Sequence, residues 1–516
     1  MSDILLCTLN ARYSHASLGL RYLRANMGAR AAHTRIVEFV LGVKTEVAVE
    51  QLLAHGPRVI GFGVYIWNVD ETTRIVAMLK VLAPAVVVVL GGPEVSFETA
   101  GQRICALADY VVTGWGDVSF PRLVAQIIDG PRPIMKVHAG EQPPLAEIVM
   151  PYAEYTDEDI AQRHLYVEAS RGCPFKCEFC LSALDKTAWP FDLDAFLAQM
   201  AQLYERGARQ FKFVDRTFNL NVKTGLAILE FFIGRIEARP DDPCFVHFEV
   251  VPDHLPDALK AGIRRFPPGA LQFEIGIQTF NPEVQKRVSR RQDNDKAEAN
   301  IRWLREHSNA HLHVDLIAGL PGETIESFAA GFDRLHALRP HEIQFGILKR
   351  LRGTPMIRHT DAHHMRYNPD PPYNILATDA IDFPSMQRLV RFARYWDLVA
   401  NSGRFKATLP LLLPHHTTGS AFHAFLAFAD WLFARTGQTH RIAMERLFDL
   451  MHEYLLSAPS LDRIDVETAL TGDYAATGGK GRLEWMTDDQ QRRGAAVRRE
   501  AHGAPARQAR HLEPAG

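Results

Sequence analysis

Short apolar segments alternate with longer amphipathic ones through the first part of the chain. Each is a run of Val, Ile and Leu that ends in Gly or a polar residue, and helix-length stretches separate them: DILLCTL, TRIVEFV, RVIGFGVYI, AVVVVLGG and YVVTG. Apolar strands that alternate with helices are typical of a parallel sheet covered by helices on both faces. The pattern predicts a doubly wound α/β domain over residues 1–135.

A second series of strand patterns begins near residue 164. Six of them alternate with helical patterns: HLYVEAS, QFKFVD, CFVHFEV, LQFEIGIQT, HLHVDLIAGL and EIQFGIL. Six strand–helix repeats suit an open version of the eight-stranded barrel, so we expect a partial (β/α)6 barrel of TIM type over residues 164–365. Residues 136–163 contain several prolines and no periodicity, as is typical of a linker.

The pattern changes again after the predicted barrel. Helical periodicity in segments such as SMQRLVRFARYWDLVANS and SAFHAFLAFADWLFART predicts a helical C-terminal domain over residues 366–485. Residues 486–516 are polar and contain too few large apolar side chains to build a core, so we expect them to form a disordered tail.

Composition excludes some classes of partner. The 516 residues include 58 basic and 60 acidic ones, so no overall field would attract nucleic acid. The N-terminus lacks the basic start and apolar run of a signal peptide, and no apolar stretch reaches the roughly 18 residues needed to span a bilayer. We therefore expect a cytoplasmic protein without a nucleic-acid or membrane partner.

Glycines mark the strand ends of the first predicted domain. Ligands of open parallel sheets bind at the carboxyl ends of the strands. This edge would contain Gly61, Gly63, Gly91, Gly92, Pro93, Glu94, Gly114 and Gly116. In the predicted barrel, polar residues collect at the corresponding strand ends, among them Asp215, Glu249 and Gln278.

Three of the six cysteines lie within the segment SRGCPFKCEFC. Cys173, Cys177 and Cys180 have the spacing C-x3-C-x2-C, while the other cysteines are scattered. In a reducing cytosol such a group indicates metal binding rather than disulfides. Iron–sulfur clusters are normally held by four cysteines, so three would leave one iron open to another ligand. A structural zinc site with His164 as the fourth ligand is the alternative that the spacing leaves open.

The cysteine segment resembles the signature of the radical S-adenosylmethionine (SAM) superfamily. The resemblance implies that the three cysteines hold a [4Fe–4S] cluster whose open iron binds SAM. It further implies reductive cleavage of SAM to a 5′-deoxyadenosyl radical, with electrons from an external donor such as flavodoxin or ferredoxin. Phe179 matches the aromatic residue that packs near the adenine.

Further motifs extend this resemblance through the predicted barrel. FVDRTFN resembles the second-strand segment, with Asp215 kept and Arg216 in place of a second acid; FEIGIQTF resembles the fourth-strand motif. The resemblance places Glu274 and Gln278 towards SAM or substrate, and Ile317 and Gly319 of DLIAGLPGET at the adenine site. Motifs in this order favour the iron–sulfur interpretation over zinc.

For several residues the sequence leaves a functional and a structural interpretation open. Asp215 and Glu249 are either ligands or ordinary caps and ion-pair partners. Glu274 lies inside an apolar strand, where a carboxylate is costly unless it is paired or functional. Arg290 and Arg291 either reach the methionine carboxylate or form a solvated charge run.

The first domain resembles the Rossmann-like cobalamin-binding domains fused to one branch of this superfamily. The segments GFGVYIWN, VVVVLGGPE and VVTGWGD carry the resemblance, which implies that the glycines permit close approach of the corrin. The Asp-x-His-x-x-Gly motif of many cobalamin proteins is absent. His15, on the loop after the first strand, is a cobalt ligand, a corrin contact or a helix-start residue.

Together the resemblances imply a cobalamin-dependent radical SAM enzyme that methylates an unactivated carbon of a small-molecule or peptide substrate. Cyclisation or rearrangement without methyl transfer is the alternative within the same branch. Methylthiotransfer to tRNA and a non-enzymatic cobalamin sensor are two further hypotheses. The helical C-terminal region resembles a domain with no assigned activity, and the substrate is not specified by any motif.

Overall fold

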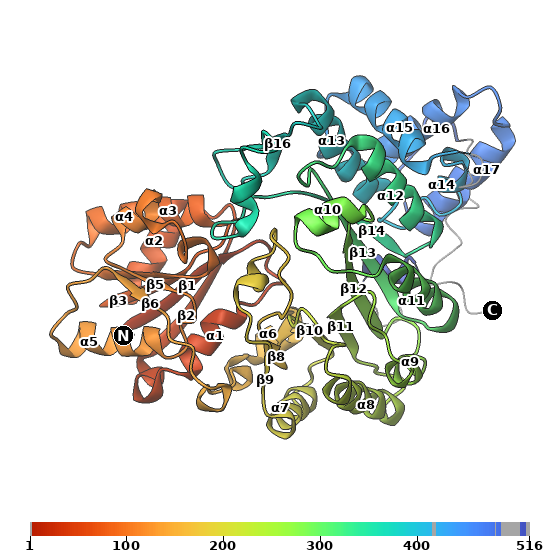
Figure 1. Cartoon of the computed structure of the whole chain (residues 1–516). Helices are drawn as coiled ribbons and strands as arrows, with labels where there is room; N and C mark the ends of the chain where they lie inside the picture. The colour runs from red at the N-terminus through yellow and green to blue at the C-terminus, as the bar shows by residue number, and fades with distance from the viewer. Residues whose placement is uncertain (1–2, 415–418, 480, 487–505, 512–516) are drawn as a thin grey trace. The chain divides into compact units, whose positions relative to one another are not determined.

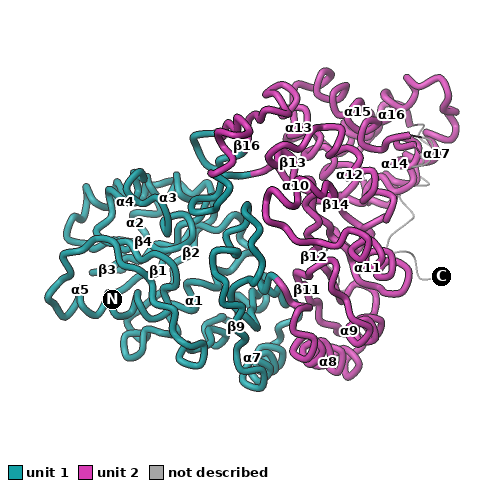
Figure 2. The backbone as a smooth tube through the Cα atoms, in the orientation of Figure 1, with its two compact units in different colours: residues 1–216, 349–357, 368–374 teal, residues 217–348, 358–367, 375–516 magenta. Residues whose placement is uncertain are grey.

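The computed structural model describes residues 3–414, 419–479, 481–486 and 506–511. The chain divides into two compact units, coloured separately in Figure 2. Unit 1 comprises residues 1–216, 349–357 and 368–374, and unit 2 comprises residues 217–348, 358–367 and 375–516. Two short segments that follow the predicted barrel strands, residues 349–357 and 368–374, therefore belong to the N-terminal unit. The domain boundaries given above stay predictions.

The first sheet lies in unit 1 and confirms the doubly wound prediction. Its strands have the order β2-β1-β3-β4-β5-β6, and the pairs are parallel. The strands are β1 (Ile4–Asn10), β2 (Thr34–Val40), β3 (Val59–Gly63), β4 (Val87–Gly91), β5 (Tyr110–Thr113) and β6 (Val137–Ala139). The helices between them are α1 (Leu18–Ala25), α2 (Thr45–Ala54), α3 (Val69–Leu82), α4 (Arg103–Leu107) and α5 (Ser119–Asp129).

Two hydrophobic clusters cover the two faces of this sheet. One contains residues of α2, α3 and α4, such as Leu52 and Leu79, and the other contains residues of α1 and α5, such as Leu20 and Phe120. Figure 1 shows the same division of the helices. Because successive strand side chains point to opposite faces, a strand that is buried on both is mostly apolar, as β1 is; its two polar residues, Thr8 and Asn10, donate hydrogen bonds to the carbonyl oxygens of Gly63 and His15.

The second sheet confirms the partial barrel. Its strand order, β14-β13-β12-β11-β10-β7, is the chain order reversed, and β7 and β10 belong to unit 1. The strands are β7 (Leu165–Val167), β10 (Gln210–Phe213), β11 (Phe245–Val250), β12 (Leu271–Gln278), β13 (His311–Ala318) and β14 (Glu342–Ile347). The helices of this region are α7 (Leu193–Glu205), α8 (Val222–Ala238), α9 (Asp257–Ile263), α10 (Pro282–Arg287), α11 (Asn294–His307) and α12 (Ile325–Ala337).

The C-terminal part of unit 2 is helical, as the periodicity predicted. It contains α13 (Phe383–Val399), α14 (Leu409–Leu412), α15 (Ala421–Thr436), α16 (Met444–Leu456) and α17 (Arg463–Ala476). Most of the predicted tail, residues 487–505 and 512–516, lies outside the described residues; α19 (Ala506–Ala509) is the helix described within it. None of the helices described in the structure has both the length and the apolar character needed to cross a bilayer.

Short elements complete the fold. They include α6 (Asp157–Gln162) and the strand pairs β8 (Ser170–Arg171) with β9 (Trp189–Pro190) and β15 (Arg366–Tyr367) with β16 (Ile375–Ala377). The 3-10 turns are η1 (Gly28–His33), η2 (Pro93–Val95), η3 (Thr99–Gly101), η4 (Leu145–Glu147), η5 (Tyr152–Glu154), η6 (Leu181–Leu184) and η7 (Pro355–His359).

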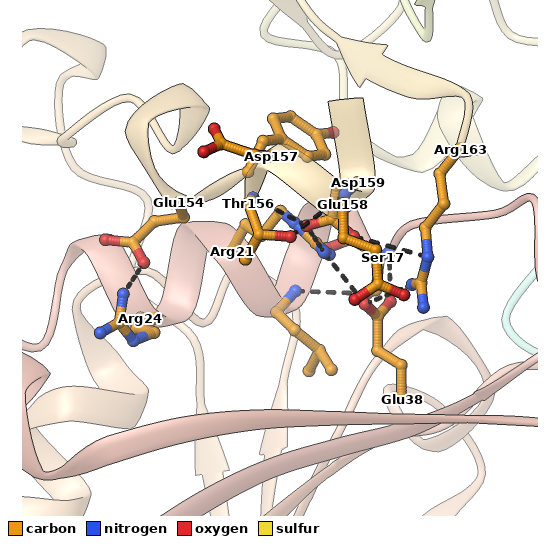
Figure 3. A network of polar contacts seen from close by, with 12 residues as sticks. Ser17, Arg21, Arg24, Glu38, Glu154, Thr156, Asp157, Glu158, Asp159 and Arg163 are labelled. Carbon is orange, nitrogen blue, oxygen red and sulfur yellow. Dashed lines mark hydrogen bonds and ion pairs between the residues drawn. The ribbon is translucent and has the colours of Figure 1, made fainter. Parts of the chain in front are cut away.

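A buried ionic network fixes the predicted linker to the first sheet within unit 1. Figure 3 shows Arg21 of α1 between Glu38 of β2 and Asp159 of α6, and the closest N–O distances are 3.0 and 2.7 Å. Arg163 also donates to Glu38, at 2.9 Å. Buried charges are costly to leave unpaired, so this network ties α6, and the strand β7 that follows it, to the first sheet.

Candidate functional site

A cavity of about 330 Å³ opens at the carboxyl edge of the first sheet. All six glycines predicted from the strand ends line it: Gly61, Gly63, Gly91, Gly92, Gly114 and Gly116. Its volume falls within the range of small-molecule and cofactor sites, and most of its wall is apolar. The charged side chains in its lining are Asp117, Glu168 and Arg171.

Two of these glycines are also required by packing. A Cβ atom at Gly61 would lie 2.7 Å from the ring of Phe120. Gly92 has φ +108°, and a Cβ there would lie 2.5 Å from the carbonyl oxygen of Val64. Gly63 differs, because a Cβ atom at this position would meet its nearest neighbours at 3.5 Å. The absence of a side chain at Gly63 leaves space in the cavity, and packing of the fold does not require glycine at this position.

The structure leaves three predicted cofactor contacts outside the cavity lining. Pro93 begins η2, and the Glu94 carboxylate accepts hydrogen bonds from Arg352 and Tyr373, both at 2.8 Å. His15 lies 2.5 Å, through Nδ1, from the hydroxyl group of Tyr166 on β7. Burial and the neighbouring His164 lower the pKa of His15. The cobalt-ligand role of His15 stays a prediction that this geometry does not support.

The cysteine loop, residues 172–188, connects β8 to β9. These strands pair antiparallel at its base, with Arg171 opposite Trp189. Gly172, at φ +87°, brings the two arms close together, since a Cβ atom there would lie 2.7 Å from the backbone nitrogen of Ala188. The Cys173 N–H donates to the Asp185 carbonyl at 2.8 Å. A glycine and backbone hydrogen bonds therefore shape the loop.

The three thiols fit a cluster by their chemistry and by their spacing along one loop. Cys173 and Cys177 are buried, and Cys180 is partly exposed. Burial raises the pKa of Cys173, and the charges of Cys180 and Cys177 raise it further, while a backbone hydrogen bond to Phe175 lowers it. Among the described residues, no three His, Cys, Asp or Glu side chains already surround one metal position.

His164 is placed away from the cysteine loop. It precedes β7, whereas the cysteines follow that strand, and its Nδ1 lies 3.0 Å from the side-chain oxygen of Gln210. Three strand residues span about 10 Å, so His164 is not positioned as a fourth zinc ligand. Phe179 lies next to Cys180 in the loop and is partly exposed.

Asp215 is buried behind the backbone that leads into the cysteine loop. Its carboxylate accepts hydrogen bonds from the Ala169 N–H at 2.9 Å and the Ser170 hydroxyl at 2.6 Å. Burial raises its pKa to about 7. The carboxylate that the sequence left open as a ligand or an ordinary cap thus holds the segment between β7 and β8.

Unit 2 brings three carboxylates together on neighbouring strands. Glu249 of β11 pairs in register with Glu274 of β12, and Gly276 of β12 pairs with Asp315 of β13. Burial, together with the charges of Glu274 and Glu249, raises the pKa of Asp315 well above its usual range. Asp315 was missed in the sequence, although HLHVDLIA alternates polar with apolar residues.

Two histidines and an arginine accompany these carboxylates. His247 Nε2 lies 3.3 Å from Glu274 Oε2, and His313 Nε2 lies 3.7 Å from Asp315 Oδ1. Arg290 donates to the carbonyl oxygen of Gly276, while Arg291 is exposed. The arrangement can bind ionic or hydrogen-bonding groups of a ligand.

The remaining predicted residues follow the same strands. Gln278 has a positive φ of 68° at an irregularity in the β12–β13 pairing. Ile317 pairs in register with Gly346. Gly319 has φ +87°, and a Cβ atom there would lie 2.6 Å from Ile375 of β16. Packing against β16 therefore accounts for the glycine at position 319.

Three family models match consecutive parts of the chain. Residues 4–124 match the B12 binding domain, residues 167–335 match the radical SAM superfamily, and residues 361–507 match a protein family of unknown function, DUF4080. The chain is a B12-binding radical SAM protein. It is therefore an enzyme whose cofactors are a [4Fe–4S] cluster, SAM and cobalamin, and such enzymes generally need an external reductant.

Relatives of this B12-binding radical SAM protein cover different shares of the chain. An uncharacterized methyltransferase of Pyrococcus horikoshii is 24% identical over 379 residues, which are 67% of this chain and 79% of the relative. A ribosomal protein uS12 methylthiotransferase RimO of Pelobacter propionicus is 26% identical over 197 residues, 37% of this chain and 43% of the relative.

A solved structure shares the fold of the B12-binding radical SAM protein. The radical SAM methyltransferase TsrM of Kitasatospora setae, with tryptophan and a SAM analogue bound, has a TM-score of 0.58 at 17% identity. The match covers 84% of this chain and 96% of TsrM. At this level of identity the likeness shows a common fold.

Proposed function

We propose that this chain is a cobalamin-dependent radical SAM enzyme that methylates an unactivated carbon of a small-molecule or peptide substrate. The observation that carries the proposal is the cavity at the carboxyl edge of the first sheet. Seven glycines line it, among them the six at the strand ends, and its lining includes Arg171, two residues before Cys173. Glycines in the wall allow the backbone to approach a large flat ligand closely, and the cavity adjoins the loop that supplies three thiols.

Different residues of the chain would bind the different cofactors. Cys173, Cys177 and Cys180 would hold the cluster, and the six glycines would lie against cobalamin. When bound, the cluster and SAM supply a 5′-deoxyadenosyl radical and cobalamin supplies a carrier for the methyl group. Glu249, Glu274 and Asp315 would bind polar groups of SAM or substrate, and a flavodoxin or ferredoxin would be the electron donor.

The names of the relatives support methyl transfer. The Pyrococcus horikoshii relative is called a methyltransferase, and TsrM is one. Methylthiotransfer would require a second cluster on cysteines of the first domain. Cys7 and Cys105 are instead buried in its apolar core, and they are scattered along the chain rather than grouped on one loop.

Anaerobic reconstitution with iron, sulfide and hydroxocobalamin tests the proposal. The loaded full-length protein, supplied with SAM and a chemical reductant, is expected to release 5′-deoxyadenosine, and S-adenosylhomocysteine should accumulate with a methyl acceptor. The Cys177→Ala variant should lose both products, while the Cys244→Ala variant, altered at a buried cysteine outside the loop, should keep them.

Each outcome of this experiment bears on a different part of the proposal. Absence of a SAM-responsive cluster contradicts the radical SAM assignment for these cysteines. A cluster without bound hydroxocobalamin contradicts the cobalamin role of the cavity. 5′-Deoxyadenosine without S-adenosylhomocysteine, in the presence of a converted substrate, would favour cyclisation or rearrangement instead.

A further inference from the structure

The β5–α5 loop, residues 114–117, contacts both ends of the cysteine loop. Asp117 accepts two hydrogen bonds from Arg171, from Nη1 at 2.8 Å and Nη2 at 3.1 Å. The indole N–H of Trp115 donates to the Asp185 carboxylate at 2.8 Å. Arg171 directly precedes the cysteine loop, and Asp185 lies near its far end. One loop of the first sheet therefore holds both arms of the segment that carries the thiols.

The guanidinium group of Arg171 has further partners besides Asp117. Its Nε donates to Glu168 at 2.7 Å, and its guanidinium group lies over the rings of Tyr22 and Trp115, at 4.3 and 4.9 Å from their centres. The side chains of Arg171 and Asp117 are 13% and 7% exposed. A bidentate, largely buried ion pair has little freedom to rearrange, so a movement of Asp117 is transmitted to Arg171.

Asp185 connects Trp115 to the first cysteine. Its carboxylate accepts from the Trp115 indole and from the Thr187 N–H, the latter at 3.1 Å. Its backbone carbonyl accepts the Cys173 N–H at 2.8 Å. Two hydrogen bonds on a single residue thus link the Trp115 side chain to the backbone of Cys173.

The same β5–α5 loop forms part of the cavity wall. All four of its residues line the cavity, as do Glu168 and Arg171. We propose that Trp115 and Asp117 are positioning residues that couple occupancy of the cavity to the stability of the cysteine loop. A ligand in the cavity holds the β5–α5 loop in the conformation that bonds Arg171 and Asp185. The coupling rests on the proposed function, in which cobalamin occupies this cavity.

Coupling between two binding sites is reciprocal, which makes the proposal measurable from both sides. The full-length protein is reconstituted with a [4Fe–4S] cluster, and an iron chelator is added anaerobically with or without hydroxocobalamin. Hydroxocobalamin is expected to slow cluster loss at least about five-fold, the lower end of typical coupling between sites. The affinity for hydroxocobalamin, measured with and without the cluster, should change in the same direction.

The variants Trp115→Phe and Asp117→Asn test the two links. Trp115→Phe keeps an aromatic ring and removes only the indole N–H. Each variant should lose most of the five-fold effect at hydroxocobalamin concentrations that saturate that variant. Arg122→Gln is the matched control, because Arg122 lies on α5 in an exposed ion pair with Glu141, and its effect should equal that of the unaltered chain.

Three results would overturn the inference: a rate of cluster loss that hydroxocobalamin does not change, variants that retain the whole effect, or the same loss in Arg122→Gln. Circular dichroism of each variant separates loss of coupling from loss of folding, and Trp115→Phe provides the test if Asp117→Asn does not fold. Failure of the unaltered protein to bind either cofactor would contradict the proposed function instead.

Discussion

The two parallel sheets of this chain present different chemistry to their ligands. The first sheet ends in glycines, and the cavity at its carboxyl edge is mostly apolar. The strands β11, β12 and β13 of the second sheet carry Glu249, Glu274 and Asp315 within their length. The site on the first sheet is formed by glycines, which have no side chain. The site on the second sheet is formed by charged side chains on neighbouring strands.

The difference follows from what each site would bind. Backbone atoms can approach a broad apolar surface most closely where no Cβ atom intervenes, and each such glycine costs about 0.5–1 kcal/mol relative to alanine. Charged strand residues can bind polar groups, but like charges on neighbouring strands repel and burial penalises each of them. The raised pKa of Asp315 is the sign of that cost. Glycines should therefore tolerate only small substitutions, and the carboxylates should trade stability for binding.

Asp215 tests the cost of buried charge with the largest expected effect. Burial raises its folded pKa to about 7, above the unfolded value of 3.8, so its protonated form is favoured in the folded state. Stability from this group is full below pH 3.8 and is lost as the pH rises through 7, by on the order of 4 kcal/mol. In Asp215→Asn this pH dependence should disappear.

Urea unfolding of the protein without cofactors, at pH 5 and pH 8, measures the part of this difference that lies above pH 5, about 2.7 kcal/mol. Asp293→Asn is the control, since that exposed carboxylate has a lowered pKa and is ionised at both values. An Asp215→Asn variant whose unfolding midpoint keeps the pH dependence of the unaltered chain would show that Asp215 is already ionised at pH 5.

Gly63 tests the glycine edge. A leucine side chain there would enter the cavity, and overlap worth about 3 kcal/mol should weaken hydroxocobalamin binding at least about 100-fold. Gly63→Ala should have a small effect, because the added Cβ atom meets its neighbours at 3.5 Å. Equilibrium titration of both variants checks this, with cluster content as the measure of intact folding. Equal affinities for the two would mean that the ligand does not use this cavity.

The sequence predicted the glycine edge better than the charged face. Glycines at the ends of successive parallel strands must meet at one edge, so Gly61, Gly91 and Gly114 could be grouped from their positions alone. Asp315 could not, because its environment depends on Glu274 of the neighbouring strand, and register between strands is not local information. The fold classes were predictable from the sequence, because hydrophobic periodicity is a local property of each segment.

Loop residues were predicted least well. Glu94 follows two of the correctly placed glycines, yet its carboxylate binds Arg352, which is 258 positions away in the chain. His15 follows β1 directly, but it contacts Tyr166, at a separation of 151 positions. A sequence motif shows which strand a loop follows, whereas these long-range contacts decide which way its side chains point.

Glu274→Gln tests the expected trade between stability and function. Removing one of the charges that raise the pKa of Asp315 should stabilise the fold by up to about 1 kcal/mol, seen as a rise in melting temperature of roughly 2 °C. Release of 5′-deoxyadenosine should fall. Glu326→Gln, in the first turn of α12, should change neither quantity. A variant that melts earlier and retains its activity would indicate a structural ion pair with His247 rather than a binding role.

His15→Phe should have the smallest effect and so sharpens the description of the glycine edge. Its imidazole faces Tyr166 and packs 6.1 Å from the ring of His164, and it is not among the residues that line the cavity. Hydroxocobalamin affinity should change less than about two-fold, well below one factor of ten or 1.4 kcal/mol. The electron paramagnetic resonance spectrum of the reduced, bound cobalamin should also be unaltered. Loss of nitrogen coupling in that spectrum would instead identify His15 as a cobalt ligand, which would require the loop after β1 to turn towards the cavity on binding.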